Sequence, residues 1–244
     1  MNNIKEIFEG FKNLKVLVIG DLMVDSYSFG KVTRISPEAP VPVLNLTKRE
    51  NRLGGAGNVV KNILSLGAKP IVCSVIGNDS SGKIILDLLK EDNLSTNMVI
   101  QEENRITTSK ERVISGSQQI VRIDDETDSM ISNSSLNLLI EKISNIIAEV
   151  DVIIFEDYDK GVLNEELIQK IISLAKEKNI ATVVDPKKRN FLSYSGVDLF
   201  KPNLKELLDG LNISNSKIEL EDLKTLTEDF RKKFQMKNIF LTMS

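Results

Sequence analysis

Gly54-Gly55-Ala56-Gly57-Asn58, which leads into residues 59–67, is the stretch that decides the fold of this chain. Three glycines in four positions allow a sharp turn and a close approach of the backbone to a ligand. The apolar residues that follow recur at helical spacing, which predicts a helix with one buried face. A glycine-rich turn that opens a helix presents free N–H groups and the positive end of the helix dipole. The stretch therefore indicates either a site for hydroxyl or anionic oxygens or a tight turn with close helix packing.

Composition narrows the class of protein. The 244 residues suffice for one large α/β domain, and 41% apolar with 27% charged residues is an ordinary globular balance. The net charge of −3, with both signs interspersed, gives no sign of a nucleic-acid surface. The only cysteine is Cys73, within an apolar run, and there is no histidine, which excludes a disulfide framework and His-based catalysis. No signal peptide and no apolar run of about 20 residues is present. We therefore expect a cytoplasmic protein without membrane partners.

Buried strands and amphipathic helices alternate along most of the chain. Four apolar runs are typical of strands buried on both faces: 14–19, 70–76, 151–155 and 180–184. Helical spacing between these runs predicts right-handed crossovers and a mainly parallel sheet. Two segments differ, since 26–51 is proline-rich and 105–124 alternates loosely. The prolines of 26–51 indicate edge strands or an excursion away from the central sheet, and 105–124 contains short strand-like pieces.

Polar residues follow several of the expected strands, where open α/β sheets bind their ligands. They are Asp21, Asp25, Lys160, Asp185, Lys187, Asn203 and Glu206. Either aspartate after the first strand is also explained as a turn cap. Lys160, followed by a glycine, is suited to hold a phosphate as a point charge, although a solvated loop lysine is the commoner role. Asn203 with Glu206 resembles a capping box, which by itself explains both residues.

Two motifs resemble a known family. Gly54-Gly55-x-x-Asn58, entering a helix that ends at Gly67, resembles the sugar-binding signature of the ribokinase-like (PfkB) carbohydrate kinases. Arg34–Val43 resembles, more specifically, the kinase domain of bacterial ADP-heptose synthesis enzymes. The resemblance runs through nearly the whole chain. It implies a single ribokinase-like α/β domain over 1–244, with three α/β/α layers, a mainly parallel central sheet and a small β-strand lid from about 26–51 and 105–124.

The resemblance also implies a reaction and a set of site residues. The reaction is ATP- and Mg²⁺-dependent phosphorylation of D-glycero-β-D-manno-heptose 7-phosphate at its anomeric hydroxyl, for ADP-heptose and lipopolysaccharide core synthesis. The implied sugar-phosphate contacts are Asp25, Gly54, Gly55, Asn58, Arg112, Gln118, Lys160 and Lys187. The implied nucleotide contacts are Asn203, Glu206 and Thr242, and Mg²⁺ is expected at Asp185, Asn203 and Glu206 through water. Solvated strand faces explain Arg112 and Gln118 equally well. A homodimer joined through the lid strands is also implied.

One family motif does not occur in the sequence. Family members carry Gly-Ala-Gly-Asp, whose Asp takes the proton of the sugar hydroxyl, so the catalytic base here is unknown and is expected beyond Ser244. We expect a C-terminally incomplete kinase domain that binds sugar phosphate weakly and catalyses little. The alternatives are a PfkB kinase for another sugar phosphate and a non-catalytic sugar-phosphate-binding remnant. A Rossmann dehydrogenase is disfavoured, because neither Gly20 nor Gly55 begins a G-x-G-x-x-G fingerprint.

Overall fold

A parallel sheet forms the centre of the protein. The computed structural model describes residues 3–213 and 218–243. Within them the central strands are β1 (Lys15–Gly20), β4 (Lys69–Gly77), β5 (Val99–Glu102), β8 (Val152–Glu156), β9 (Ala181–Asp185), β10 (Leu199–Phe200) and β11 (Asn238–Ile239). They are ordered β11-β10-β9-β8-β1-β4-β5, and each neighbouring pair is parallel. The mainly parallel sheet expected from the alternation of strands and helices is confirmed.

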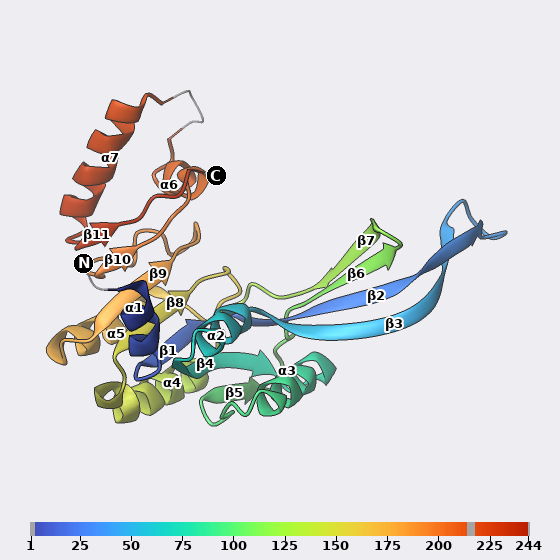
Figure 1. Cartoon of the computed structure of the whole chain (residues 1–244), viewed down its shortest axis with the longest axis horizontal. Coiled ribbons are helices and arrows are strands. Elements are labelled where there is room, and N and C mark those ends of the chain that lie inside the picture. Colours follow the sequence, from blue (N-terminus) through green and yellow to red (C-terminus); the bar gives the residue numbers. More distant parts are fainter. Residues whose placement is uncertain (1–2, 214–217, 244) are drawn as a thin grey trace.

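Helices cover both faces of this sheet (Figure 1). They are α1 (Ile4–Phe11), α2 (Ala56–Ser65), α3 (Ser80–Glu91), α4 (Asn133–Ile146), α5 (Glu165–Glu177), α6 (Leu204–Gly210) and α7 (Leu220–Lys233), with a 3₁₀ turn at Ile147–Glu149. None of the helices in the described part of the chain has both the length and the apolar character needed to cross a membrane.

Alternate residues of β1 define the two layers of the core. Val16 and Val18 pack in one cluster with apolar residues of α2 and α3. Leu17 and Ile19 pack in the other cluster with residues of α4 and α5. All four side chains are buried, as a strand at the centre of a parallel sheet requires. The two clusters establish the expected three-layer α/β/α arrangement.

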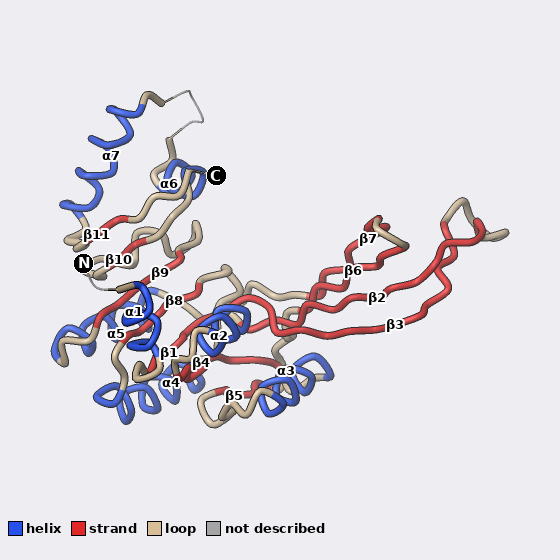
Figure 2. The backbone as a smooth tube through the Cα atoms, viewed as in Figure 1, coloured by secondary structure: helices blue, strands red, loops and turns tan. Residues whose placement is uncertain are grey.

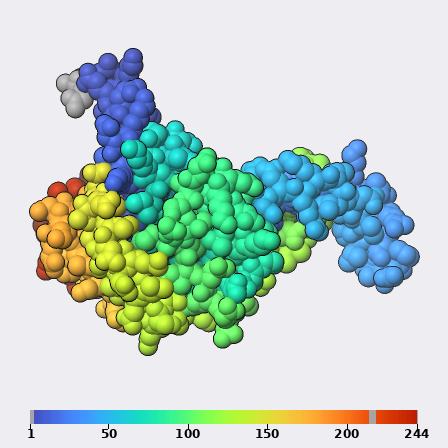
Figure 3. Space-filling model, turned by 90° about the horizontal axis from the view of Figure 1, so that it is seen from below, coloured from blue at the N-terminus to red at the C-terminus, as the bar shows by residue number. Residues whose placement is uncertain are grey.

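A second sheet projects from the body as an arm. Its strands are β2 (Leu22–Ile35), β3 (Pro42–Gly55), β6 (Ser109–Ser115) and β7 (Gln118–Asp125), in the order β3-β2-β6-β7. β6 pairs with β2 only from Val24 to Gly30, so β2 and β3 continue as a two-stranded ribbon (Figure 2). Figure 3 shows the arm leaving the body on one side, and α1, in dark blue, projecting from the body away from the arm. The arm comes from the two segments to which the lid was assigned, and its closure over a sugar stays a prediction.

Candidate active site

Carboxylates gather at the carboxyl edge of the central sheet. Glu156 at the end of β8 pairs with Gly20 of β1 on one side and with Asp185 of β9 on the other. Asp21 follows β1 directly, and β2 then carries the chain into the arm. Ligands of open α/β sheets bind at this edge. The root of the arm therefore lies where a substrate site is expected.

Asp25 and Arg112 meet at the root of the arm. Asp25 lies within β2 rather than in a loop, and Nη1 of Arg112 lies 2.6 Å from its Oδ1. This hydrogen bond raises the pKa of Arg112. The guanidiniums of Arg112 and Arg52 lie over the ring of Tyr27, 5.3 and 4.8 Å from its centre. The structure thus brings two of the predicted sugar contacts together on one face of the arm.

The paired glycines let β3 and α2 approach β2 closely. A Cβ on Gly54 would lie 2.5 Å from Oδ2 of Asp25. Gly55 has a φ of +57°, and a Cβ there would lie 2.4 Å from the carbonyl oxygen of Asp21. Both distances are too short for a real side chain. The tight-packing interpretation is therefore correct, and sugar binding by these glycines stays a prediction.

Asn58 lies in the first turn of α2 and is exposed. It lines a cavity of about 320 Å³ together with Arg52 and Lys61. Gln118 lies elsewhere, at the start of β7, where it pairs with Ser115 at the outer end of β6. The structure therefore places Asn58 near the root of the arm and Gln118 away from it.

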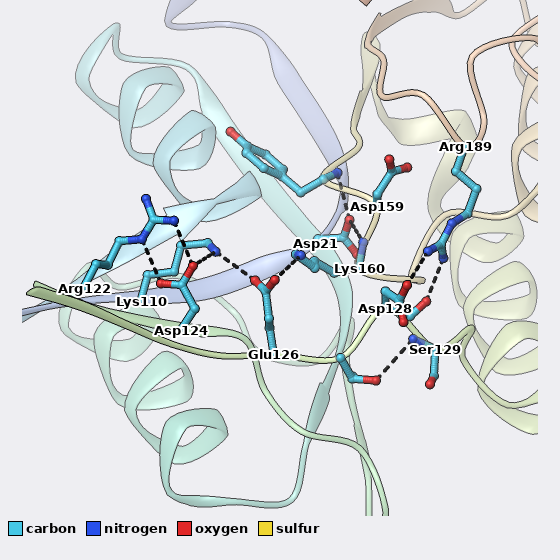
Figure 4. A network of polar contacts seen from close by, with 12 residues as sticks. Asp21, Lys110, Arg122, Asp124, Glu126, Asp128, Ser129, Asp159, Lys160 and Arg189 are labelled. Carbon is cyan, nitrogen blue, oxygen red and sulfur yellow. Dashed lines mark hydrogen bonds and ion pairs between the residues drawn. The ribbon is translucent and has the colours of Figure 1, made fainter. Parts of the chain in front are cut away.

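Lys160 is connected to the arm through an alternating chain of charges (Figure 4). Its Nζ lies 2.8 Å from Oε1 of Glu126, and Nζ of Lys110 lies 2.8 Å from Oε2 of the same carboxylate. Lys110 also lies 3.1 Å from Asp124, which accepts hydrogen bonds from Arg122. Hydrogen bonds from Lys110 and Lys160 hold the pKa of Glu126 below its ordinary value. The sequence analysis did not identify Lys110 or Glu126.

Asp21 organises the loop that carries Lys160. Its Oδ2 accepts hydrogen bonds from the backbone N–H groups of Tyr158 and Lys160 at 2.9 and 3.2 Å. Its Oδ1 accepts one from Val162 at 3.1 Å. Burial, with Asp157 nearby, raises the pKa of Asp21 to about 6. Asp21 therefore caps a loop distant in sequence, not its own turn. Its position directly after a buried strand is the sequence feature that pointed to it.

A second group of charges lies where α6 begins. The capping box is present, because Oδ1 of Asn203 accepts from the N–H of Glu206 and Oε2 of Glu206 accepts from the N–H of Asn203, both at 2.8 Å. Thr242 adjoins it, since its N–H donates to Pro202 and its carbonyl accepts from Leu204. The three predicted nucleotide contacts therefore lie side by side.

Lysines neutralise the carboxylates of this group. Nζ of Lys187 contacts Oε1 of Glu206 and lies 3.8 Å from Asp185, and Nζ of Lys201 lies 2.7 Å from Asp185. Burial lowers the pKa of Lys187, but the hydrogen bond to Glu206 and the charges of Glu206 and Asp185 together outweigh burial, so the pKa is raised. Lys187, predicted as a sugar contact, thus lies with the nucleotide residues. Lys201, directly before a proline that precedes Asn203, was missed.

Glu156 is a further buried carboxyl that the sequence analysis did not single out. Burial, with Asp185 nearby, raises its pKa to about 8. Its position at the end of a buried strand was the signal that could have found it. A pKa raised in this way favours the protonated carboxyl and reduces the negative charge that Glu156 adds to the group.

The donors at the start of α6 decide whether the expected Mg²⁺ fits there. In the ranges 3–213 and 218–243, no three His, Cys, Asp or Glu side chains are close enough to hold a metal ion directly. Mg²⁺ commonly retains several waters and binds one or two carboxylates plus substrate phosphates. Asp185 and Glu206, joined by Lys187, offer such a pair. These donors fit an ion that arrives with a nucleotide and is held through water.

Comparison with known proteins gives a consistent result. The family described as pfkB family carbohydrate kinase matches residues 13–244. The bifunctional protein HldE of Sulfurimonas denitrificans is 41% identical over 229 residues, 94% of this chain and 47% of that protein. HldE of Syntrophotalea carbinolica is 36% identical over 244 residues, 99% of this chain and 49% of that protein. The chain therefore spans about half the length of the curated relatives it matches.

Solved structures share the fold. Phosphofructokinase-2 from Escherichia coli, in complex with fructose-6-phosphate, aligns with a TM-score of 0.73 at 18% identity and covers 95% of this chain and 74% of its own. A carbohydrate kinase from Agrobacterium tumefaciens aligns with a TM-score of 0.67 at 15% identity, over 95% and 70% of the two chains. Identities this low bear on the fold alone. The two aligned structures confirm the ribokinase-like three-layer architecture.

Proposed function

This chain belongs to the pfkB family of carbohydrate kinases, and from that premise we propose that it binds a sugar phosphate at the root of the arm and ATP at the start of α6. The γ-phosphoryl group is then transferred to the sugar. Such a transfer depends on positioning and on neutralising the charge of the phosphates. Mg²⁺, when bound with the nucleotide, supplies part of that neutralisation.

One observation carries the proposal: a single short loop after β8 reaches both groups of charged residues. Lys160 of this loop contacts Glu126 beside the arm. Two residues earlier, the ring of Tyr158 lies 5.8 Å from Nζ of Lys187, which contacts Glu206. The sugar half and the nucleotide half are thus joined by residues 158–160. An acceptor hydroxyl and a nucleotide phosphate bound to the two halves would face each other across this loop.

We propose D-glycero-β-D-manno-heptose 7-phosphate as the sugar and its 1,7-bisphosphate as the product, for ADP-heptose and lipopolysaccharide core synthesis. The support is the resemblance of Arg34–Val43 to the kinase domain of ADP-heptose synthesis enzymes, together with the HldE relatives. Cations at the root of the arm suit a substrate that carries a phosphate: Lys110, Arg112, Arg122 and Lys160. The presence of ATP and sugar phosphates in the cytoplasm makes that compartment the proposed location.

We further propose that two copies of the chain pair through their arms. Beyond Gly30 the arm is a two-stranded ribbon, which is marginally stable alone in water. Ile35, Val41 and Leu46 of this ribbon are exposed, as is Ile123 of β7. A second copy with the same apolar ribbon would bury these side chains in a self-complementary contact. Sedimentation of the wild type and of an Ile35→Asp variant tests this proposal. The wild type should sediment as a dimer and the variant as a monomer, and a monomeric wild type would contradict the proposal.

Calorimetric titration of the 244-residue chain tests the substrate proposal. Binding is the readout because the sequence contains no Gly-Ala-Gly-Asp motif. Heptose 7-phosphate should bind saturably, glucose 6-phosphate should bind at least about tenfold more weakly, and circular dichroism should confirm that the chain is folded. Equal affinities would favour a kinase for another sugar phosphate. No binding of either sugar by the folded chain would reject the proposed sugar site.

A further inference from the structure

We propose that Glu126 occupies the phosphate subsite of the free protein, between Lys110 and Lys160, and that the phosphate of the substrate binds there by displacing this carboxylate. The ligand class is a phosphomonoester dianion. The inference rests on the proposed function and deepens it, because it names the residues that receive the phosphate and the group that competes with it.

The two lysines converge from separate parts of the fold. Lys110 extends from β6 in the arm, and Lys160 from the loop that follows β8 in the body. Their ammonium groups lie 2.8 Å from the two different oxygens of Glu126 (Figure 4). Their side chains are 19% and 18% exposed, and that of Glu126 is 32% exposed. An anion thus already bridges the arm and the body at a place that solvent reaches.

The charges of this cluster favour a more highly charged anion than a carboxylate. Glu126 brings one negative charge to two ammonium groups. Asp124 also contacts Lys110, but both of its oxygens accept hydrogen bonds from Arg122 as well. A phosphomonoester carries about −1.5 to −2 charges at neutral pH and three acceptor oxygens. It can therefore contact both lysines and neutralise them more completely than Glu126 does.

The cluster lies beside the sugar site proposed at the root of the arm. Lys110 is the cross-strand neighbour of Asp25, the predicted contact for sugar hydroxyls. Neighbouring strands lie about 4.8 Å apart, so the phosphate subsite would adjoin the hydroxyl site. A sugar that carries its phosphate on a terminal carbon can reach both places at once.

The backbone beside the cluster is held independently of Glu126. Arg105 donates hydrogen bonds to the carbonyl oxygens of Ser129 and Lys160, which joins the segment after β7 to the loop after β8. The N–H of Ile131 also donates to the carbonyl of Gly161 at 3.1 Å. Glu126 itself lies just beyond the last residue of β7, outside any strand or helix. Its side chain can therefore turn away while the two lysines stay in place.

Glu126→Gln tests the inference, with Asp125→Asn as the matched control. Asp125 is the adjacent exposed carboxylate, and strand alternation directs it to the other face of β7. The probes are inorganic phosphate, heptose 7-phosphate and unphosphorylated heptose, titrated into the folded chain. Glu126→Gln removes a negative charge that would repel the phosphate at contact distance. Both phosphate-bearing probes should therefore bind the variant about tenfold more tightly than the wild type. Asp125→Asn should bind them as the wild type does, and heptose should bind all three proteins equally.

The pattern of results separates this inference from the proposed function. Tighter binding of inorganic phosphate by Glu126→Gln than by the wild type, without binding of heptose 7-phosphate, would support the subsite and reject the proposed sugar. Saturable binding of heptose 7-phosphate with unchanged or weaker affinity in Glu126→Gln would support the function and overturn the subsite. A double variant, Lys110→Met with Glu126→Gln, should not bind phosphate more tightly than the wild type. Tighter phosphate binding by this double variant would also overturn the subsite. Failure of every phosphate probe to bind any of the proteins would overturn it as well.

Discussion

Arg112 donates a hydrogen bond of 2.6 Å to Asp25, although the two residues are 87 positions apart in the sequence. The bond joins β6 to β2 at the root of the arm, and Gly54 adjoins the same carboxylate on the β3 side. A carboxylate oriented by this hydrogen bond is prepared for a ligand, which lowers the entropy lost on binding.

Removal of Arg112 should therefore weaken sugar-phosphate binding more than it lowers stability. The side chains of Arg112 and Asp25 are 24% and 23% exposed. Ion pairs that solvent reaches contribute about 0–1 kcal/mol to folding, so we expect the free energy of unfolding of Arg112→Ala to lie within about 1 kcal/mol of the wild-type value. Its affinity for heptose 7-phosphate should fall at least about tenfold, because a positioned, charge-assisted contact is lost. Arg49→Ala is the control, since Arg49 is an exposed arginine of the same arm on β3. Equal affinities of the two variants would contradict the role of Arg112.

Two glycines with similar positive φ angles should differ sharply in their tolerance of alanine. Gly55 and Gly116 have φ values of +57° and +61°. A Cβ on Gly55 would meet the carbonyl of Asp21 at 2.4 Å, whereas a Cβ on Gly116 would have nothing within 4 Å. Gly116→Ala should cost about 1–2 kcal/mol from backbone strain alone. Gly55→Ala should cost at least about 2 kcal/mol more, from overpacking. Urea unfolding measures both, and similar costs would show that the close approach at Gly55 is unimportant.

The capping asparagines of α5 and α6 separate a structural role from a nucleotide-binding role. Oδ1 of Asn164 and Oδ1 of Asn203 each accept a hydrogen bond from the third helical residue, at 2.9 and 2.8 Å. Replacing either asparagine with alanine should cost about 1 kcal/mol of stability. Only Asn203→Ala should also weaken binding of Mg²⁺–ATP, measured by titration calorimetry, because α6 lies in the candidate site. Unchanged ATP affinity in Asn203→Ala would limit this residue to capping.

Glu156 should make the folded protein less stable as the pH rises. Its pKa is about 8 in the folded protein and 4.5 is the reference value, so between these pH values the folded protein retains a proton that the unfolded chain has lost. The free energy of unfolding therefore decreases with rising pH through this window. Denaturant unfolding at pH 5 and pH 8.5, without divalent cations, measures the change. Glu156→Gln should lose less stability than the wild type between these values, by on the order of 3 kcal/mol. Parallel behaviour of the two proteins would contradict the burial of an unpaired carboxyl.

Local patterns in the sequence predicted a large part of the fold. The apolar run 14–19 indicated a strand buried on both faces, and β1 has its side chains in both core clusters. Asn203 and Glu206 indicated a capping box, which is present. These features depend on residues within a few positions of one another, through side-chain period or a local hydrogen bond. The resemblance to a family predicted the lid segments and most of the candidate site residues.

Residue spacing could not predict the ion pairs that Glu126 makes with two lysines. Lys110, Glu126 and Lys160 stand in segments without a shared motif, and the sequence analysis assigned a role only to the last of them. Likewise, Lys187 was expected near the sugar but contacts Glu206 at the start of α6. In each case the partner lies on a different element, so its identity follows from how the elements pack.

The sequence alone therefore determined which segments become strands and helices, because hydrophobic period and end caps act over a few residues. Only the tertiary structure decided which charges meet. The register of β6 against β2 places Lys110 beside Asp25. Ser129 passes close to Gly161, since a Cβ on Gly161 would lie 2.1 Å from the carbonyl oxygen of Ser129. This close passage brings Glu126 to Lys160. Strand register and the close approach of two loops arise from contacts between distant segments, which a local sequence pattern does not predict.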